Sequence, residues 1–446
     1  MSNQQIAVVG LGETGLSCVN FLLKQGKQVT VFDTRQTPPG EQKLDSSVKL
    51  LKGELSFELL AKFELIIVSP GIALATPALQ FALVKGCEVI GDIELFAREL
   101  KQPEYAHAKL VTISGSNGKS TVTSLLGEMA VAAKVKVAVG GNIGVPALDL
   151  LAPEIDLYVL ELSSFQLETT FSLNADIATI LNISEDHMDR YDSYADYTAA
   201  KHRLYEQCKM VLYNRDDQLT YPKNPKVNKT SFGFDRLAYG LLSDADQQIF
   251  LAKEGSAILA VHHLKLSGKH NWMNALAAFA LGEAVGLSET AMLTALQEYA
   301  GLPHRCEFVT EINNIRWIND SKATNIGATQ AALWGLSETI PGNVHVILGG
   351  DGKGADFNEL ASVLEEIHGL IVCFGLDGQK IAAQNKRALL VENLDQAVDK
   401  IFTTAQAGDL VILSPACASL DMYKNFMQRG EHFKRLVKAL LARTNG

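Results

Sequence analysis

The sequence predicts an α/β protein that is divided into three blocks and built on parallel sheets. Short apolar runs of strand length alternate with amphipathic segments of helix length along the 446 residues, and this alternation is typical of repeated strand–helix–strand units. Turns that lead from a strand into a helix recur in three parts of the chain, and its length favours more than one domain. We expect the domains to span residues 1–95, 96–301 and 302–446.

The apolar runs define the expected strands of each block. In the first block they are Ile6–Val9, Val29–Phe32, Leu65–Val68 and Glu88–Ile90. In the second block they include Leu110–Ser114, Val135–Val139, Leu157–Leu160 and Ile177–Leu181. In the third block they are Ile315–Asn319, Val344–Leu348, Leu370–Phe374 and Leu410–Leu413.

The remaining segments are less regular or helical. Residues 220–265 predict a β-rich meander. His270–Val285 and Ser288–Tyr299 then predict a helical pair, and Asn425–Arg443 predicts a C-terminal helix, because their apolar residues recur at helical spacing.

Composition argues against several classes of protein. The net charge is −10 and the chain has no long run of lysine and arginine, which argues against a nucleic-acid surface. The six cysteines are scattered without a Cys-x-x-Cys pair, as in proteins of a reducing compartment. We see no secretion signal and no apolar run of about 20 residues that would span a bilayer. A cytoplasmic monomer without membrane insertion is therefore the simplest expectation.

The most informative motif is Ser114-Gly115-Ser116-Asn117-Gly118-Lys119-Ser120-Thr121, which lies between an expected strand and an expected helix, Val122–Ala133. Backbone N–H groups of a glycine-bearing loop and the N-terminus of a helix together bind phosphate. Lys119 is placed to reach the outer phosphates, and the Ser120 hydroxyl to ligate Mg²⁺. Ile113 stands where the general P-loop has a glycine, so this is a shortened form of the loop.

A second glycine-rich turn, Gly10-Leu11-Gly12-Glu13-Thr14-Gly15, follows the first expected strand, and Asp33 ends the next one. This spacing is close to a dinucleotide-binding fingerprint, which would make the chain a dehydrogenase that uses NAD(P). Arg35 beside the acid suits a phosphate or diphosphate instead, and Ser69-Pro70-Gly71 adds another turn. The spacing alone leaves both ligands open.

Polar side chains follow further strands of the second block. Glu161 ends an apolar strand, where a carboxylate near a P-loop is well placed as a Mg²⁺ ligand, and Asn142 lies in a glycine-rich turn. Asp186, His187 and Asp189 follow another strand and are candidates to ligate or orient a second metal, although helix capping by an aspartate is an alternative. Lys201 lies on the helix-like stretch Tyr194–Gln207.

The third block has ligand-like turns at the ends of its strands. Arg305 is a candidate to neutralise phosphate, and Asp320 to hold a ribose. Lys322 and Thr324 are placed to face anions, and Lys353 to bind a carboxylate. Each turn has an ordinary capping role as its alternative, but several on one edge of a sheet favour a ligand-binding face.

Four motifs occur in a characteristic order: Gly115-x-x-Gly118-Lys119-Ser120-Thr121, Glu161-Leu162-Ser163-Ser164, Asn182-x-x-Glu185-Asp186-His187-Met188-Asp189 and Tyr197-x-x-x-Lys201. In this combination the chain resembles the Mur ligase family, the ATP-dependent amide ligases that build the peptide stem of peptidoglycan. The resemblance implies a Rossmann-like N-terminal domain for a UDP-sugar, a central P-loop ATPase-like domain and a mobile C-terminal Rossmann-like domain for the amino acid.

The third block is most similar to the members that add D-glutamate, through Leu302-Pro303-His304-Arg305, Asn319-Asp320-Ser321-Lys322-Ala323-Thr324-Asn325 and the stretch from Ser414 to Gly430. The resemblance implies UDP-N-acetylmuramoyl-L-alanine and D-glutamate as substrates. It also implies ATP and two Mg²⁺ ions.

The resemblance also assigns residues to each ligand. The implied catalytic residues are Lys119, Glu161, His187, Lys201 and Asn142. The implied ATP-binding residues are Gly115, Ser116, Asn117, Gly118, Lys119, Ser120, Thr121, Asn271, His304, Arg305 and Asp320. The implied metal ligands are Ser120, Glu161, His187 and Lys201, the lysine as a carbamate. The implied UDP-sugar contacts are Thr14, Asp33, Thr34, Arg35, Gly71, Ser163 and Gln166. The implied D-glutamate contacts are Thr324, Lys353, Ser419 and Phe426.

Three other functions stay open beside the ligase. A dehydrogenase would explain the first glycine-rich turn but has no use for the P-loop. A nucleotide-dependent switch would bind ATP without forming an amide. A folate polyglutamylating ligase would share the central motifs but lack the turn at Gly10–Gly15 followed by Asp33-Thr34-Arg35.

Overall fold

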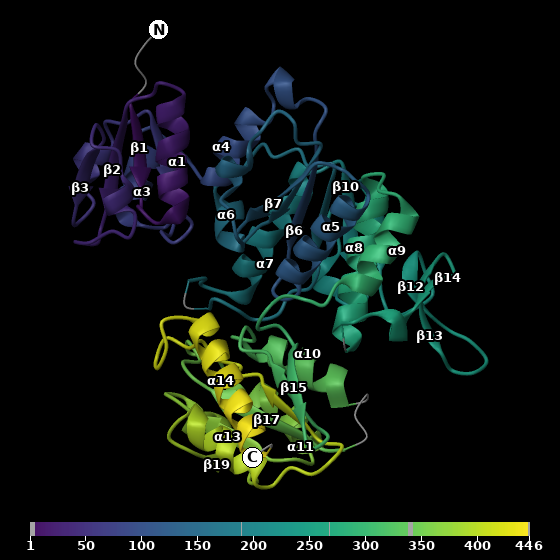
Figure 1. Ribbon diagram of the computed structural model, residues 1–446. Helices are drawn as coiled ribbons and strands as arrows, with labels where there is room; N and C mark the ends of the chain where they lie inside the picture. Colours follow the sequence, from purple (N-terminus) through teal and green to yellow (C-terminus); the bar gives the residue numbers. More distant parts are fainter. Residues whose placement is uncertain (1–4, 189, 267, 338–341, 445–446) are drawn as a thin grey trace.

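The computed structural model describes residues 5–188, 190–266, 268–337 and 342–444. The chain forms three α/β units that follow one another in sequence (Figure 1), and their described strands make sheets of five, nine and six strands. The prediction of an α/β protein with parallel sheets is confirmed. In this part of the chain, none of the helices combines the length and the apolarity that crossing a membrane requires.

The N-terminal sheet is parallel throughout and has the order β3-β2-β1-β4-β5. Its strands are β1 (Ile6–Val9), β2 (Val29–Asp33), β3 (Lys49–Lys52), β4 (Leu65–Val68) and β5 (Glu88–Ile90). Its helices are α1 (Glu13–Lys24), α2 (Phe57–Leu60) and α3 (Pro77–Val84). The sequence analysis missed β3, because this edge strand has only two apolar residues between lysines and is not fully buried.

The middle sheet has the order β14-β13-β12-β11-β10-β9-β6-β8-β7. Its parallel core comprises β6 (Lys109–Ser114), β7 (Val137–Gly141), β8 (Leu157–Glu161), β9 (Ile177–Ile180), β10 (Met210–Asn214) and β11 (Asn228–Phe232). The meander consists of β12 (Tyr239–Ser243), β13 (Ile249–Lys253) and β14 (Ser256–Ala260), which pair antiparallel. The β-rich meander predicted for residues 220–265 is therefore confirmed.

Helices cover both faces of the middle sheet. On one side lie α5 (Lys119–Ala132), α8 (Lys269–Ala284) and α9 (Glu289–Glu298), which pack on one another (Figure 1). The other helices are α4 (Asp92–Glu99), α6 (Ser164–Glu168) and α7 (Tyr194–His202). Two of these helices differ from their predicted bounds by three residues or more: the first begins at Lys119 rather than Val122, and the helix expected to reach Gln207 ends at His202 and continues as a 3-10 turn.

The C-terminal sheet has the order β15-β16-β20-β17-β18-β19. Its strands are β15 (Glu307–Ile312), β16 (Ile315–Asn319), β17 (Val344–Gly349), β18 (Ile371–Phe374), β19 (Leu389–Leu390) and β20 (Leu410–Leu413). Its helices are α10 (Ile326–Ser337), α11 (Ala361–Glu366), α12 (Gly378–Ala382), α13 (Leu394–Phe402) and α14 (Phe426–Thr444). Among the described strands of this sheet, only β15 pairs antiparallel. Its sequence, Glu-Phe-Val-Thr-Glu-Ile, has neither a continuous apolar run nor a regular alternation that would predict a strand.

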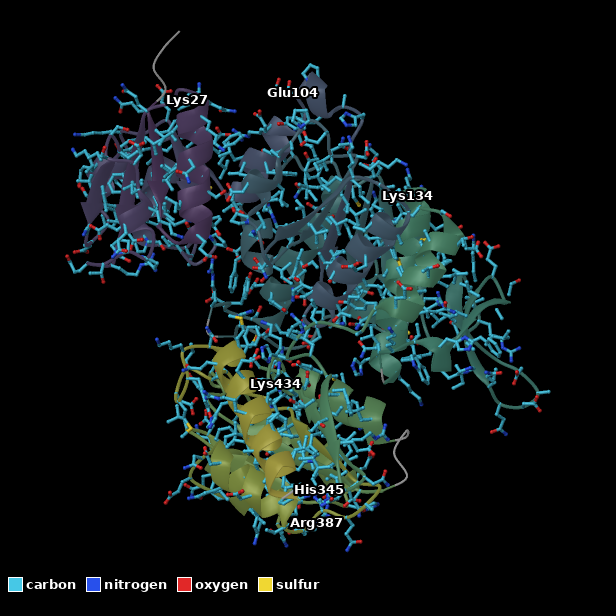
Figure 2. All side chains as sticks on the ribbon, in the orientation of Figure 1. Lys27, Glu104, Lys134, His345, Arg387 and Lys434 are labelled. Atoms are coloured by element: carbon cyan, nitrogen blue, oxygen red, sulfur yellow. The ribbon has the colours of Figure 1, made fainter. Side chains whose placement is uncertain are left out.

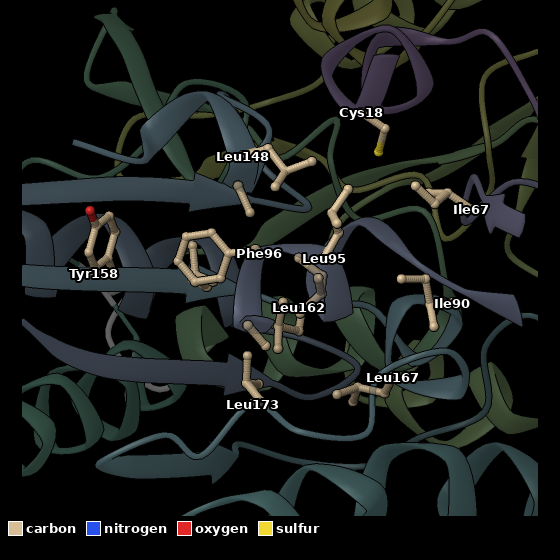
Figure 3. Close-up of a cluster of buried hydrophobic side chains, with 14 of the residues drawn as sticks. Cys18, Ile67, Ile90, Leu95, Phe96, Leu148, Tyr158, Leu162, Leu167 and Leu173 are labelled. Carbon is tan, nitrogen blue, oxygen red and sulfur yellow. The ribbon is translucent and has the colours of Figure 1, made fainter. Parts of the chain in front are cut away.

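The N-terminal and middle units share one buried hydrophobic cluster. Cys18 of α1 and Ile67 of β4 belong to the same cluster as Leu148 and Leu162 of the middle unit, with Phe96 of α4 at its centre (Figure 3). Phe96 is fully buried and packs edge-to-face on Tyr158, with 5.4 Å between ring centroids. Helix α4 thus joins the two units through apolar packing.

We expect Phe96→Ala to destabilise the protein by about 3–5 kcal/mol, because it removes a large aromatic ring from a closed core. The measurement is the urea midpoint followed by fluorescence and circular dichroism. Val84→Ala serves as the control, since Val84 is 83% exposed and a surface change of this kind alters stability by less than about 0.5 kcal/mol. Equal midpoints for the two variants would contradict the shared core.

Candidate active site

The P-loop joins the central strand β6 to helix α5. Gly115 has φ +142° and Gly118 has φ +83°, conformations that favour glycine. A side chain at Gly118 would also meet Asn274 Oδ1 at 2.5 Å. Helix α5 begins at Lys119, so its free N–H groups and its positive dipole end face the loop. The loop is thus built to bind an anion.

Lys119 folds back over this loop. Its Nζ donates to the carbonyl oxygens of Gly115 at 2.8 Å and Ser116 at 2.9 Å. Burial lowers the pKa of Lys119, while the negative charges of Glu161 and Asp186 oppose that shift. The carbonyl oxygens occupy the donors of Lys119 until a stronger acceptor such as a phosphate is present.

Glu161 lies directly beside the P-loop, because β8 pairs with β6 in a register that places Glu161 opposite Ile113. Its buried carboxylate accepts from Ser120 Oγ at 2.6 Å and Asn142 Nδ2 at 2.9 Å. Burial alone would raise its pKa, but the charge of Lys119 and these two hydrogen bonds lower the pKa of Glu161 below its usual value. The carboxylate is therefore ionised.

This carboxylate and hydroxyl fit a magnesium ion that is bound together with phosphate. Mg²⁺ prefers oxygen ligands and typically uses one or two carboxylates, water and substrate phosphates. Among the described residues, no three His, Cys, Asp or Glu side chains gather as a metal cage. Arg305 Nη2 also donates to Ser120 Oγ, at 2.5 Å, and brings a cation of the C-terminal segment to the same point.

Lys201 lies on α7 and is only 2% exposed. Its Nζ donates to Gly115 O at 3.0 Å, the same oxygen that accepts from Lys119. Burial, and then repulsion by Lys119, hold the pKa of Lys201 well below its usual value. Its amine is therefore poised to be neutral.

His187 is fixed by contacts with its neighbours. Its backbone has φ +58°, and its ring packs edge-to-face on Phe165 with centroids 4.8 Å apart. Its Nε2 lies 3.6 Å from Asp186 Oδ2. Glu161, Asp186 and His187 do not form one three-ligand group within the described residues, and Asp189 lies outside those residues.

Asp186 connects the middle unit to the C-terminal unit. Its Oδ2 accepts from Asn325 Nδ2 at 3.2 Å, and its Oδ1 lies 3.5 Å from Lys353 Nζ. Burial opposes ionisation, but His187 and Lys353 lower the pKa of Asp186. Lys353, which the sequence analysis assigned to a carboxylate, is therefore held at the cleft by a carboxylate of the protein itself.

A cavity of about 440 Å³ opens beside the P-loop, between α8 and α10. Its lining includes Asn117, Gly118, Asn271, Arg305 and Asp320, all of which the family resemblance implies as ATP-binding residues. The volume lies in the range of small-molecule sites. Burial raises the pKa of Asp320 to about 6, although hydrogen bonds from Ser414 and Cys306 oppose that shift.

His304 does not line this cavity. Its Nδ1 lies 2.8 Å from Asn319 Nδ2, and its Nε2 lies 3.6 Å from Glu431 Oε1. A side chain at Gly430 would come within 2.2 Å of the His304 ring. Lys434 of the same helix, α14 (Figure 2), binds Glu431 at 3.0 Å. The structure thus places His304 in the linker that packs on α14.

The glycine-rich turn of the N-terminal unit is closed by Asp33. The buried carboxylate accepts from Leu11 N at 2.7 Å and from Arg35 Nε and Nη2 at 2.9 and 2.7 Å. Burial opposes ionisation, but the Arg35 guanidinium holds the pKa of Asp33 at about 2. Asp33 and Arg35 therefore lie beside the glycine-rich segment Gly10–Gly15, which includes Thr14, and the acid is already paired. Ser69 Oγ donates to Gly10 O at 2.8 Å and brings the turn that contains Gly71 to the same edge.

Ser163 and Gln166 form a capping box at the start of α6. Gln166 Nε2 donates to the buried Asp92 of α4 at 3.0 Å. These two residues, which the resemblance assigned to the UDP-sugar, thus also fix the boundary between the first two units.

Three of the four residues implied for D-glutamate, Thr324, Lys353 and Ser419, lie in loops of the C-terminal unit, and Phe426 is the first residue of α14. Ser419 is buried, and the Phe426 carbonyl accepts from Ser321 Oγ at 2.8 Å. Thr324 lies two residues before α10, in the segment 321–325. Lys353 lies in the turn that follows β17.

Comparisons with known proteins agree with this geometry. Models of the Mur ligase family match three ranges: a MurD-like N-terminal domain at residues 4–91, the middle domain at 113–282 and the glutamate ligase domain at 304–417. A protein of Escherichia coli O6:H1 named UDP-N-acetylmuramoylalanine--D-glutamate ligase is 52% identical over 440 residues, 98% of each chain. The chain belongs to the Mur ligase family. A protein of the same name from Haemophilus influenzae is 49% identical over 98% of this Mur ligase and 99% of its own length.

Solved structures agree on the fold. UDP-N-acetylmuramate-alanine ligase MurC from Thermotoga maritima superposes with a TM-score of 0.60 at 20% identity, over 98% of this Mur ligase and 99% of that chain. A pseudomurein peptide ligase type C from Methanothermus fervidus also has a TM-score of 0.60, at 17% identity, over 98% and 100% of the two chains.

Sequence reasoning missed a structural arginine of this Mur ligase. Arg429 is fully buried and donates to Ser321 O at 2.8 Å, Cys417 O at 3.0 Å and Gly349 O at 3.3 Å. It therefore ties together three loops of the C-terminal sheet. The sequence indicated Arg429 only through its place in the stretch from Ser414 to Gly430.

Lys322 was expected only to face an anion. It lines the nucleotide-sized cavity, and its Nζ lies 4.4 Å from the centroid of the Phe426 ring. Burial, and then repulsion by Arg305 and Lys119, lower the pKa of Lys322 to about 8. Lys322 thus lies between the cavity and Phe426, one of the residues implied for D-glutamate.

We expect Arg35→Met to reduce stability at pH 7 by about 1–2 kcal/mol, a value discounted because Arg35 is half exposed. The folded-state pKa of Asp33 is depressed, so its contribution is complete above about pH 4 and is lost as the pH falls toward 2. Urea unfolding at pH 7 and pH 3 should therefore show a smaller difference from wild type at the lower pH. Arg236→Met, at an exposed arginine, is the control. A difference that is constant across this range would contradict the pairing.

Proposed function

We propose that this chain is an ATP-dependent ligase that joins D-glutamate to UDP-N-acetylmuramoyl-L-alanine, releasing ADP and phosphate, in the synthesis of peptidoglycan precursors. The observation that carries the proposal is the full-length similarity of about 50% to ligases of this name. The P-loop supports it, because Ser120 binds the facing carboxylate of Glu161 while Gly118 and Thr121, its neighbours in the loop, line a nucleotide-sized cavity.

The chemistry requires activation of a carboxylate. An amine does not displace oxide from a carboxylate at neutral pH, so transfer of the γ-phosphate of ATP first makes an acyl phosphate. The D-glutamate amine then forms the amide bond, and phosphate leaves with the electrons of the broken C–O bond. Lys119 and the N-terminus of α5 offset the repulsion between the two anions in the first step.

Two Mg²⁺ ions are part of the proposal. When bound, they neutralise phosphate charge, which is their usual contribution to phosphoryl transfer. Ser120 and Glu161 would hold the first ion, and His187 and Lys201 the second. Asn142 keeps Glu161 in place through its hydrogen bond of 2.9 Å.

Lys201 would hold its ion as a carbamate. CO₂ adds to a neutral amine and converts it to an anion with two oxygen ligands, whereas an ammonium group would repel the metal. Support comes from the burial of Lys201 and from the lysine that shares its hydrogen-bond acceptor.

The substrates would bind in separate units. We place the UDP group at Thr14, Asp33, Thr34, Arg35 and Gly71, and the D-glutamate at Thr324, Lys353, Ser419 and Phe426. Ser163 and Gln166 would contact the sugar end, while Asn271, Arg305 and Asp320 would hold the nucleotide. Closure over the contacts of Asp186 would protect the acyl phosphate from water. We further propose that the enzyme works in the cytoplasm as a monomer, with domains near residues 1–95, 96–301 and 302–446.

The first test is phosphate release from ATP and Mg²⁺. Release that requires both UDP-N-acetylmuramoyl-L-alanine and D-glutamate is the expected result, with L-glutamate and D-alanine as comparison acceptors. If release requires the nucleotide sugar and an amino acid other than D-glutamate, the result would support the ligase chemistry but overturn the assignment of the acceptor site. ATP binding without release in any mixture would favour a nucleotide switch.

Glu161→Gln should lower kcat at least about a hundred-fold while the protein stays folded, because the amide keeps the size of the side chain but loses the charge. Lys119→Ala should do the same. Lys134→Asn is the matched control: Lys134 follows the same helix, is exposed (Figure 2) and has a left-handed backbone that asparagine tolerates. Full activity of either P-loop variant, measured by phosphate release, would refute this mechanism.

Lys201→Ala should lose at least about a hundred-fold in kcat and regain part of it with acetate or propionate, because a free carboxylate can replace a carbamate in the cavity left by the side chain. Lys119→Ala, which lacks a cation instead, should gain nothing from the same acids. Absence of rescue in a folded Lys201→Ala protein would count against the carbamate.

A further inference from the structure

Arg190 connects the middle unit to the N-terminal unit by hydrogen bonds. It lies between β9 and α7, and its side chain is 14% exposed. Its Nη1 donates to Pro70 O at 2.6 Å, and its Nη2 donates to Ile72 O at 3.2 Å. Both acceptors belong to the turn after β4, so the guanidinium makes two hydrogen bonds across the boundary between the N-terminal and middle units.

The same guanidinium is fixed on its other side within the middle unit. Its carbon lies 3.8 Å from the centroid of the Phe165 ring, and Nη2 lies 3.7 Å from Glu168 Oε2. The backbone N–H of Arg190 donates to His187 O at 2.9 Å, and the His187 ring packs on the same Phe165. A delocalised cation stacked on an aromatic ring has little freedom to move.

Hydrogen bonds also fix the turn after β4, which Arg190 contacts, to the glycine-rich loop that begins at Gly10. Ser69 Oγ donates to Gly10 O at 2.8 Å, and Ile72 N donates to Ser69 O at 2.9 Å. Gly10 has φ +94°, and a side chain there would meet Ser69 at 2.9 Å. The two loops therefore move together, and Arg190 determines where they lie relative to the His187 segment.

We propose that Arg190 is a positioning residue for the nucleotide-sugar substrate, because it fixes the distance between the loops that hold the nucleotide and the segment where the acyl group reacts. The inference rests on the proposed function. A substrate bound at one end in the N-terminal unit presents its other end to the middle unit, so a displacement of the turn misplaces the reacting carboxylate. Small errors of this kind are costly to an enzyme.

A merely structural role would give a different result. If Arg190 only strengthened the boundary, its loss would lower stability and affect every substrate alike. Arg203 is a matched comparison, since its Nε donates to Leu167 O at 2.8 Å, its Nη2 donates to Thr170 O at 3.2 Å, and its guanidinium lies over Phe171. All of those partners lie within the middle unit.

The experiment measures kcat and the KM of each substrate for Arg190→Ala, Arg190→Lys and Arg203→Ala. Wild-type turnover that requires both substrates establishes the function independently. Arg190→Ala should raise the KM for UDP-N-acetylmuramoyl-L-alanine about ten-fold or more, while the KM for ATP changes by less than about two-fold. Arg190→Lys keeps the charge but loses the paired N–H donors of the guanidinium, so its KM for the nucleotide sugar should lie between those of wild type and Arg190→Ala.

Arg203→Ala should leave the KM for the nucleotide sugar unchanged, even if its melting temperature falls as far as that of Arg190→Ala. Equal KM values for the nucleotide sugar in wild type and Arg190→Ala, or an equal rise for ATP, would overturn the inference. If Arg190→Ala does not fold, Arg190→Lys decides, and wild-type KM values in that variant would overturn the inference too.

Discussion

Two buried amines share one carbonyl oxygen, and the charge balance around that oxygen governs the site. Lys119 and Lys201 both donate to Gly115 O, at 2.8 and 3.0 Å. A second ammonium charge is costly at this distance in a medium of low dielectric constant. Glu161 supplies one negative charge. Burial alone would raise its pKa, but the charge of Lys119 lowers it and keeps the carboxylate ionised. The same surroundings, burial first and then repulsion by Lys119, hold the pKa of Lys201 well below its usual value.

The central sheet makes this balance possible. Strand β6 lies between β8 and β9, so one strand end carries the P-loop while its neighbours end at Glu161 and at the segment of Asn182. Asn117 N donates to Asn182 Oδ1 at 2.8 Å, and Asn182 Nδ2 returns a hydrogen bond to Asn117 O at 3.0 Å. The loop is thus held by the strand ends on both sides, and its phosphate-binding N–H groups are fixed before any ligand arrives.

The outer units are attached to this centre in different ways. The N-terminal unit shares a hydrophobic cluster with the middle unit through α4 and is also held by Arg190. The C-terminal unit meets the P-loop side through polar contacts, such as Arg305 with Ser120 and Lys353 with Asp186. Polar contacts of this kind exchange with water at little cost, whereas opening a shared apolar core is expensive. The first unit is thus attached to the centre by an apolar core, and the P-loop side of the third unit by polar contacts.

The sequence by itself determined the α/β class, most buried strands and the residues of the P-loop, because these depend on apolar runs and on spacings of a few residues. It did not determine the edge strands β3 and β15, whose patterns are too weak to distinguish from loops. Tertiary structure alone decided that Arg429 ties three loops together, that His304 packs on α14 and that Arg190 reaches Pro70 and Ile72. Apart from the hydrogen bond between Arg429 and Cys417, which are 12 positions apart, these contacts join residues at least 80 positions apart, and a local pattern carries no information about a partner at that distance.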